Sequence, residues 1–215
     1  MADTDPHSSQ EEPGRTARKR RAILDAGADL FLAHGYAGTS MDDVAARAAV
    51  SKQTVYKQFT GKEALFVEIV RGMTGAAGDE VQREIADLGE RDDPERQLLA
   101  YAERQLLVVL TPRLMQLRRL VIGEAARFPE LGRALHEGGP GRAVKGLAAA
   151  FARWSERGLL DIADPEEAAS HFNWLVMGEP VNRAMFLGDA AIPDAGALRR
   201  TAAAGVRVFL AAYRR

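Results

Sequence analysis

Apolar residues recur at helical spacing along nearly the whole chain from Arg15, and no convincing run of alternating β-branched residues interrupts them. Ile23, Ala26 and Phe31, for example, share one face of a helix. Gly35 follows that helix, where a left-handed residue stops the helical turn. The sequence therefore predicts an all-α protein.

The composition is that of a globular chain. Of the 215 residues, 47% are hydrophobic and 27% are charged, which favours one large core or two smaller ones over disorder. The absence of cysteine excludes disulfides and thiolate chemistry and fits a reducing compartment. The first residues lack the apolar segment of a secretory signal, and the longest uncharged stretch, Ala168 to Gly178, is too short to cross a bilayer. We therefore expect a cytoplasmic protein without membrane partners.

The net charge of −1 hides an uneven distribution along the chain. Residues 1–14 carry a net charge of −4, residues 15–62 carry +5, and residues 63–215 carry −2. An acidic, polar segment with nothing apolar to bury is expected to be disordered. A compact basic module is a feature of nucleic-acid-binding proteins. The sequence thus predicts a disordered tail over 1–14, a DNA-binding domain over 15–62 and a larger helical domain over 63–215.

Two short helices lie within the basic module, separated by a turn of two or three residues. Ser40 can cap a helix that ends near Ala48, and Ser51 can cap another that ends near Phe59. Val55 and Phe59, four positions apart, would anchor the second helix to the core. Its remaining side chains would then face outward, toward base edges and phosphates in a major groove: Lys52, Gln53, Thr54, Tyr56, Lys57 and Gln58. The arrangement indicates a helix-turn-helix, although a solvated face of a small helical domain is an alternative interpretation.

Further basic residues flank the helix pair. A T-x-x-E capping box over residues 60–63 predicts the start of the next helix, where Lys62 can meet a phosphate together with the helix amides. The run from Arg18 to Arg21 is expected to precede the first helix or to form its first turn, where cations do not complement the helix dipole. A phosphate or minor-groove contact would explain these cations.

The residues of the module match a known pattern at fixed spacing. The matching positions close the first helix, cap and anchor the helix pair and open the next helix: Phe31, Gly35, Thr39, Ser40, Val44, Ala45, Val50, Ser51, Thr54, Val55, Tyr56, Phe59, Lys62, Glu63 and Leu65. The run GYAGTSMDDVAARAAVSKQTVYKQFTGKEALF closely resembles the DNA-binding domain of the TetR/AcrR family of bacterial transcriptional regulators. The resemblance implies backbone contacts from Thr54, Tyr56 and Lys62 and base contacts from Lys52, Gln53 and Lys57, with Thr39 and Ser40 completing the DNA-binding set.

The sequence departs from the family pattern at two positions. Ala49 stands in the turn where Gly is common, so a residue with a Cβ must accept that turn at a small strain cost. Gln53 stands where a small residue is common, and its amide is suited to hydrogen bonding with adenine. The operator sequence therefore cannot be copied from better-known relatives.

The C-terminal part resembles the C-terminal domain of the AefR-like branch, mainly through the VIGEAARFPEL run from Val121 to Leu131. The resemblance implies an all-helical domain that binds a small-molecule effector and dimerises through its last two helices. Bulky residues of the middle helices are candidates for the effector pocket, although ordinary core is the favoured interpretation for each: Leu110, Met115, Leu120, Phe128, Phe151, Trp154, Trp174, Met177 and Phe186.

We therefore expect a homodimeric, ligand-responsive transcriptional regulator, a repressor released from a palindromic double-stranded DNA operator by an unknown small molecule. One alternative is a helical DNA-binding protein without effector control; a more distant one is a helical enzyme or lipid-binding protein. No carboxylate pair, catalytic triad or dinucleotide fingerprint stands out, and the four histidines form no metal-binding motif. We expect neither an enzyme nor a cofactor or metal site.

Overall fold

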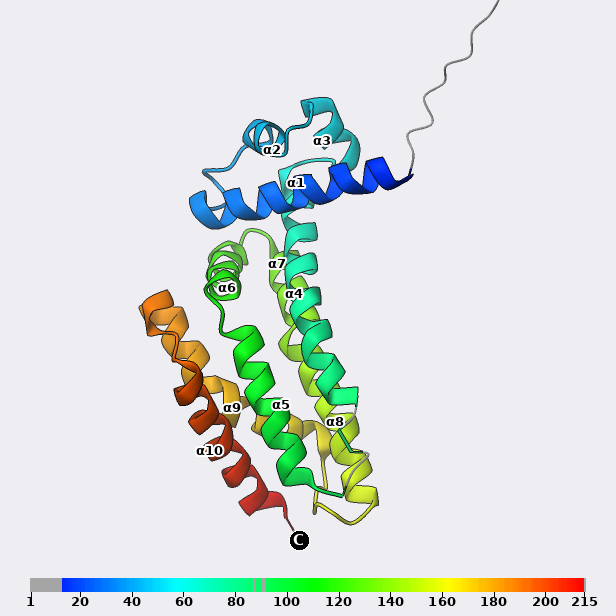
Figure 1. Ribbon diagram of the computed structural model, residues 1–215, viewed down its shortest axis with the longest axis vertical. Helices are drawn as coiled ribbons and strands as arrows, with labels where there is room; N and C mark the ends of the chain where they lie inside the picture. Colours follow the sequence, from blue (N-terminus) through cyan, green and yellow to red (C-terminus); the bar gives the residue numbers. More distant parts are fainter. Residues whose placement is uncertain (1–12, 87, 90–91, 215) are drawn as a thin grey trace, which may run out of the picture. The chain divides into compact units, whose positions relative to one another are not determined.

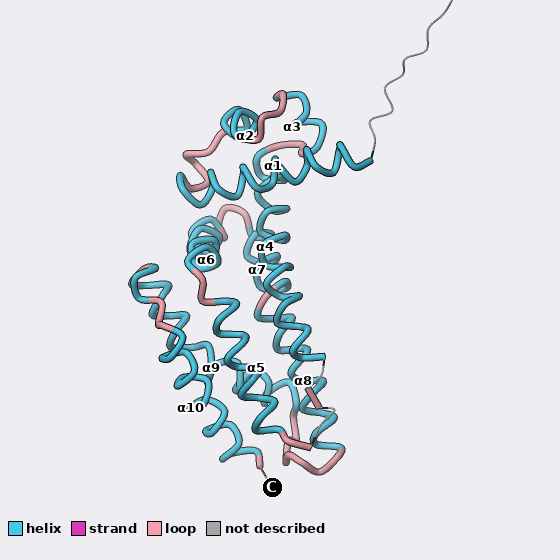
Figure 2. The backbone as a smooth tube through the Cα atoms, in the orientation of Figure 1, coloured by secondary structure: helices cyan, strands magenta, loops and turns pink. Residues whose placement is uncertain are grey.

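The computed structural model describes residues 13–86, 88–89 and 92–214, and this part of the chain is helical without a β-strand (Figures 1 and 2). The all-α prediction is confirmed. None of the described helices is both long and apolar enough to pass through a lipid bilayer. The helices are α1 (Pro13–His34), α2 (Met41–Arg47), α3 (Lys52–Gln58), α4 (Lys62–Ala86), α5 (Pro94–Val109), α6 (Pro112–Glu124), α7 (Pro129–Gly138), α8 (Pro140–Glu156), α9 (Pro165–Leu187), the 3₁₀ helix η1 (Asp189–Ala191) and α10 (Ala195–Tyr213).

The chain divides into two compact units, one up to Ile69 and one from Val70 onward. The boundary falls within α4, which runs without a break through its glycines and supplies residues to both units. Of the acidic tail predicted over residues 1–14, residues 1–12 lie outside the described part of the chain. Residues 13 and 14 already belong to α1.

An aromatic cluster forms the centre of the first unit. The ring centroid of Phe66 lies 4.6 Å from that of Phe31 and 5.5 Å from that of Tyr36, and all three side chains are buried. α1 ends at His34 because Gly35 adopts a φ of +73°, as predicted. A Cβ on residue 27 would lie 2.8 Å from Cδ1 of Ile69, so glycine at this position lets α1 approach α4.

The turn between α2 and α3 requires an unusual backbone conformation. Ser40 caps α2 and Ser51 caps α3, both as predicted. Ala49, between them, has a φ of +53°. It is the only non-glycine residue with a positive φ in the described part of the chain. The sequence-based expectation that a residue with a Cβ must accept this turn is thus met by a left-handed alanine.

Two local predictions in the first unit were wrong. Thr60 does not cap α4, because the helix begins at Lys62 and the Leu65 amide donates to the Gly61 carbonyl at 3.0 Å. The basic run at residues 18–21 does not begin α1, because that helix starts at Pro13. Arg20 instead forms an ion pair with Glu68 at 2.8 Å and lies over the ring of Phe59 at 4.5 Å, so its role is to hold the first unit together.

In the second unit, three of the helices begin at a polar capping residue followed by a proline. Asp93, Thr111 and Asp164 cap α5, α6 and α9, and each is followed by a proline at the first helical position. α8 packs on α9, and α10 packs on both α5 and α9. Buried aromatic side chains link these helices: Tyr101, Phe151, Trp154, Phe172 and Phe209.

Replacing Ala49 by Gly should stabilise the protein. A left-handed conformation costs an alanine roughly 1–2 kcal/mol relative to glycine, and the Ala49 side chain is exposed and loses no packing. We expect the free energy of unfolding of the first unit to rise by about 1 kcal/mol, measured by denaturant titration. The matched control is Ala46→Gly, an exposed position inside α2, which should lower stability by roughly 0.5–1 kcal/mol. A destabilising Ala49→Gly would contradict the strained turn.

Candidate functional site

The outward face of α3 carries the predicted base-reading residues. Val55 and Phe59 are 0% and 3% exposed, which confirms that they anchor this seven-residue helix. The side chains that point away from this anchor are those expected: Lys52, Gln53, Tyr56 and Lys57 are exposed, and Thr54 and Gln58 are half-buried. Burial of one stripe therefore fixes which side chains of α3 are available to a partner.

The N-terminus of α3 is held by paired hydroxyl groups. The Thr54 amide donates to Oγ of Ser51 at 3.2 Å, and the two hydroxyl oxygens lie 2.9 Å apart. At the same end, Nζ of Lys52 forms an ion pair with Asp42 at 2.5 Å. The hydrogen bond to Asp42 raises the pKa of Lys52, so the ammonium stays charged. Because both groups are exposed, the pair contributes little stability and a DNA phosphate or base can replace it.

Lys62 is positioned at the first residue of α4 by an aromatic ring. Its Nζ lies 4.4 Å from the ring centroid of Tyr36, and that ring is itself buried in the aromatic cluster of the first unit. A cation over an aromatic face is attracted by the ring quadrupole. Lys62 therefore has a defined position next to the amides that open α4.

The two residues that precede α2 differ in accessibility. The Ser40 hydroxyl is exposed and forms a capping box with Asp43, to which it donates at 2.6 Å. Thr39 is 3% exposed, and its hydroxyl donates to the Gly35 carbonyl at 2.9 Å. The prediction of a DNA contact from the Thr39 side chain is corrected accordingly: this hydroxyl fixes the loop after α1. The family spacing identified the position without distinguishing a buried hydroxyl from an exposed one.

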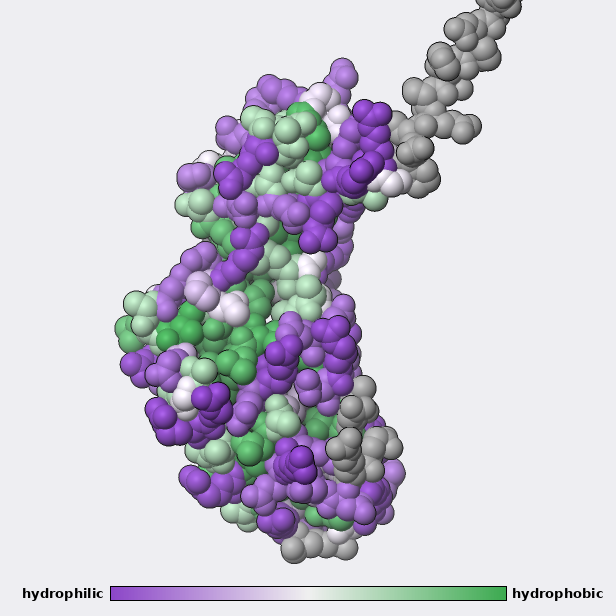
Figure 3. All heavy atoms as spheres, viewed as in Figure 1, coloured by the Kyte–Doolittle hydropathy of each residue, from purple (hydrophilic) through white to green (hydrophobic). Residues whose placement is uncertain are grey.

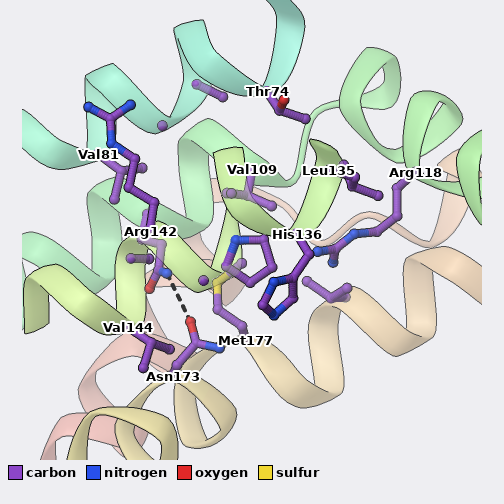
Figure 4. A pocket seen from close by; sticks show the side chains of 18 of the residues that line it. Thr74, Val81, Val109, Arg118, Leu135, His136, Arg142, Val144, Asn173 and Met177 are labelled. Atoms are coloured by element: carbon purple, nitrogen blue, oxygen red, sulfur yellow. Dashed lines mark hydrogen bonds between the residues drawn. The ribbon is translucent and has the colours of Figure 1, made fainter. Parts of the chain in front are cut away.

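The second unit contains a cavity of about 770 Å³ lined by residues of α4 to α9 (Figure 4). Of the predicted pocket residues, Met115, Trp174 and Met177 line it. Leu110, Phe151 and Trp154 belong to the buried core instead. Leu120, Phe128 and Phe186 are not among its lining residues, and Phe186 is largely exposed. The size of an apolar residue predicts that it lies on the inner side of a helix. It does not predict whether the side chain borders the cavity or packs in the core.

Sequence reasoning missed the polar residues of the cavity wall. Gln105, Arg118, His136 and Asn173 all line it. Gln105 donates from Nε2 to Oδ1 of Asn173 at 3.1 Å, drawn as the dashed line in Figure 4. No local sequence motif predicts these residues, because they come from four different helices. Only the packing of the second unit brings them together.

Apolar side chains remain exposed on the last two long helices. Leu175 and Phe186 of α9 and Val208 of α10 are 41%, 84% and 51% exposed. Figure 3 shows apolar side chains gathered on one face of the second unit, below the position of α6 in this view. Contiguous exposed apolar surface of this kind marks an interaction site. Within the chain, α9 and α10 approach closely at Gly205, where a Cβ would lie 3.0 Å from Val176.

The fold and this surface define a class of protein, the helix-turn-helix proteins with an attached helical domain. Comparison with family models matches residues 23–69 to the bacterial regulatory proteins of the tetR family. Residues 96–215 match the C-terminal domain of AefR-like transcriptional repressors. The chain belongs to the TetR family of transcriptional regulators. Members of this family are regulators rather than enzymes, and they bind DNA operators as dimers and respond to small-molecule effectors.

Individual relatives extend over nearly the whole chain. A TetR-family regulator from Mesorhizobium loti is 40% identical with a TM-score of 0.88, and the match covers 94% of this chain and 99% of that one. An HTH-type transcriptional regulator of Mycobacterium tuberculosis is 31% identical over 82% of this chain and 78% of its own length. The flavonoid-responsive regulator FrrA is 31% identical with a TM-score of 0.71, covering 92% of this chain and 98% of its own.

The capping box of α2 should make stability depend on pH. The hydrogen bond from the Ser40 hydroxyl, followed by that from the Ser40 amide, holds the pKa of the Asp43 carboxyl below its ordinary value of 3.8. A lowered folded-state pKa contributes stability above pH 3.8 that is lost as the pH falls through the folded value. Asp43→Asn should therefore unfold at lower denaturant than wild type at neutral pH, with the difference shrinking below pH 3.8. Ser40→Ala is the control, because it removes the partner; a difference between wild type and Asp43→Asn that is constant with pH would contradict the assignment.

Proposed function

We propose that the protein is a cytoplasmic homodimeric repressor that binds a palindromic operator and is released from it by a small-molecule effector. The observation that carries this proposal is the outward face of α3, where buried Val55 and Phe59 leave Lys52, Gln53 and Lys57 exposed. A seven-residue helix with this face fits the major groove, where amide and ammonium groups distinguish base edges.

The exposed residues divide into two roles. Lys52, Gln53 and Lys57 would contact base edges, and Gln53 is suited to adenine because its amide matches N6 and N7 of that base. A second set would contact the phosphate backbone: Ser40, Thr54, Tyr56 and Lys62. Phosphate contacts fix the orientation of the protein on the duplex, and base contacts select the sequence.

Homodimerisation through α9 and α10 is supported by their exposed apolar side chains. Leu175, Phe186 and Val208 lie on these two helices, and the exposed small residues Ala211 and Ala212 of α10 allow a second helix to approach. A two-fold dimer matches a palindromic operator, because each subunit then reads one half-site about 34 Å from the other.

Effector control is supported by the cavity, which has the volume of a site for a drug-sized molecule. α4 contributes the cavity-lining residues Thr74, Gly78 and Val81, and the same helix starts at Lys62 in the first unit. An effector that binds better to a conformation in which the two α3 helices no longer match the half-sites would release the DNA. The shift is limited by the effector's difference in affinity between the two conformations. A DNA-binding protein without effector control has no use for such a cavity.

Substitutions on the first unit should separate the two kinds of DNA contact. Lys62→Gln should weaken binding to all sequences alike and reduce the salt slope by about 0.9 for each phosphate that is no longer neutralised. Gln53→Ala and Lys57→Gln should instead change the order of preference among operator variants. Fluorescence anisotropy with the promoter region of the protein's own gene, measured over a salt series, gives both quantities.

The control for these measurements is Arg133→Gln, which removes an exposed cation of the second unit and should leave affinity within about twofold of wild type. A reduction of affinity by the same factor for every sequence in Gln53→Ala would exclude its base-reading role. Binding by the wild type that does not weaken with salt would count against the DNA-binding proposal as a whole.

The proposed dimer interface can be tested by mass. Light scattering at micromolar concentration should give twice the mass of one chain for the wild type, because the exposed apolar side chains are covered in the dimer. The double variant Phe186→Glu, Val208→Glu should give the mass of one chain, since paired carboxylates would be buried without partners. Leu107→Glu, at a 42% exposed leucine of α5, is the matched control and should remain dimeric. A wild type that scatters as a single chain would refute the interface.

A further inference from the structure

Arg118 of α6 stands out in the wall of the cavity because nothing in the described part of the chain neutralises it. Its side chain is largely withdrawn from solvent, and this burial lowers the pKa of its guanidinium. No hydrogen bond or ion pair engages it among the described residues. The neighbouring Arg119 is different, because it binds the Asp189 carboxylate and the Ala184 carbonyl. Arginine stays protonated even when desolvated, so the cavity contains an uncompensated positive charge.

The other charged residues of the wall do not cancel this charge. Arg142 is held by Asp79 at 2.6 Å, and Lys145 and Glu166 are exposed side chains in contact with solvent. His136 lines the cavity near Arg118, and Figure 4 shows its ring and the guanidinium of Arg118 directed toward one another. An imidazole offers a hydrogen-bond donor but no negative charge. Since no carboxylate of the described residues pairs with Arg118, a molecule in the cavity can supply the charge that balances it.

A second group in the wall lacks a partner independently of Arg118. Gln105 is 3% exposed and donates through Nε2 to Asn173, but its Oε1 is buried and accepts no hydrogen bond from the residues that the structure describes. Buried acceptors are nearly always satisfied in proteins, so this oxygen requires a donor. Arg118 and Asn173 enter the view of Figure 4 from different sides, with Met177 between them in projection. The open acceptor and the open cation thus lie at separate places along the wall.

Between these polar groups the wall is apolar. Val109, Leu135, Val144 and Met177 line it together with the ring of Trp174. A wall of this kind binds the hydrocarbon or aromatic body of a ligand, while a few polar groups fix its orientation. Water alone can hydrogen-bond to Gln105 and Arg118, but it supplies no negative charge.

We propose that the cavity binds an amphipathic organic anion, an apolar molecule whose single acid group pairs with Arg118 and whose hydroxyl or N–H group donates to Oε1 of Gln105. The inference rests on the proposed effector function of the cavity and adds the chemical class of the effector. A carboxylate is the best match, since it accepts two parallel hydrogen bonds from a guanidinium. Neutral molecules with the same apolar body lack the pairing and bind more weakly.

Two fluorescent probes with the same skeleton test the charge. 1-Anilinonaphthalene-8-sulfonate is an anion, and N-phenyl-1-naphthylamine is its neutral counterpart without the sulfonate. Arg118→Met keeps an unbranched side chain, shorter than that of arginine, and removes the charge. We expect this change to raise the dissociation constant of the anionic probe about tenfold or more, because a charge-assisted hydrogen bond is removed. The dissociation constant of the neutral probe should stay within about twofold.

Control variants locate the effect. Arg133→Met removes an exposed cation outside the cavity and should change neither dissociation constant. Val109→Trp fills the cavity and should abolish binding of both probes. Arg118→Lys retains the charge and should keep most of the binding of the anionic probe, and thermal unfolding of each variant verifies that it is folded.

Each outcome bears on a distinct claim. Equal affinity of the anionic probe for wild type and Arg118→Met, or an equal reduction for both probes, overturns the anion inference and leaves the cavity as an effector site. If Arg118→Met does not fold, the wild type alone decides the question. Equal affinity of the wild type for the two probes then overturns the anion inference. Binding of neither probe, or binding unaffected by Val109→Trp, removes the cavity as a ligand site and with it the effector part of the proposed function.

Discussion

The burial of Val55 and Phe59 is the interaction on which the rest of the first unit depends. α3 has seven residues and is too short to be stable in water by itself, so it depends on the burial of this apolar pair where the helix packs against α1 and α2. The same insertion fixes the rotation of the helix about its axis. The polar residues of α3 therefore need no further device to face outward. The left-handed Ala49 and the Ser51 cap have a separate task, because they lie in the turn and set the direction in which α3 leaves α2.

In the second unit, buried side chains fill one part of the interior and leave a cavity in another. Its aromatic residues fill the space among α5, α8, α9 and α10, whereas the walls contributed by α4, α6 and α7 enclose unfilled volume. An empty cavity forgoes packing interactions and an unpaired guanidinium forgoes solvation, so both reduce stability. A bound ligand restores these interactions and stabilises the conformation to which it binds. Under the proposed function, sensitivity to an effector and incomplete packing would be two aspects of the same arrangement.

Sequence reasoning succeeded where the determining interaction is local. The caps of α2 and α3 at Ser40 and Ser51 were predicted because each capping oxygen accepts from an amide three residues further on. It failed where the partner is distant along the chain. The ion pair of Arg20 spans 48 residues, and the hydroxyl of Thr39 is buried by the packing of the whole unit. The polar wall of the cavity was missed for the same reason, since residues such as Gln105 and Asn173 lie 68 positions apart.

Several cations of the first unit are paired with carboxylates within that unit. Arg20, Arg21, Arg47 and Lys52 each form an ion pair with a carboxylate of the same unit. Such pairs leave fewer cations to displace counterions from DNA, and the salt dependence of binding follows the number of phosphates that are neutralised. The pair of Lys52 with Asp42 differs from the others because it lies at the N-terminus of α3. Moving Lys52 from Asp42 to DNA leaves the carboxylate unpaired beside the duplex, where it repels phosphates at every sequence. In the proposed base-reading role of Lys52, only a site that offers this ammonium a good acceptor would offset the repulsion, and the pair with Asp42 would then raise the discrimination between the operator and other DNA.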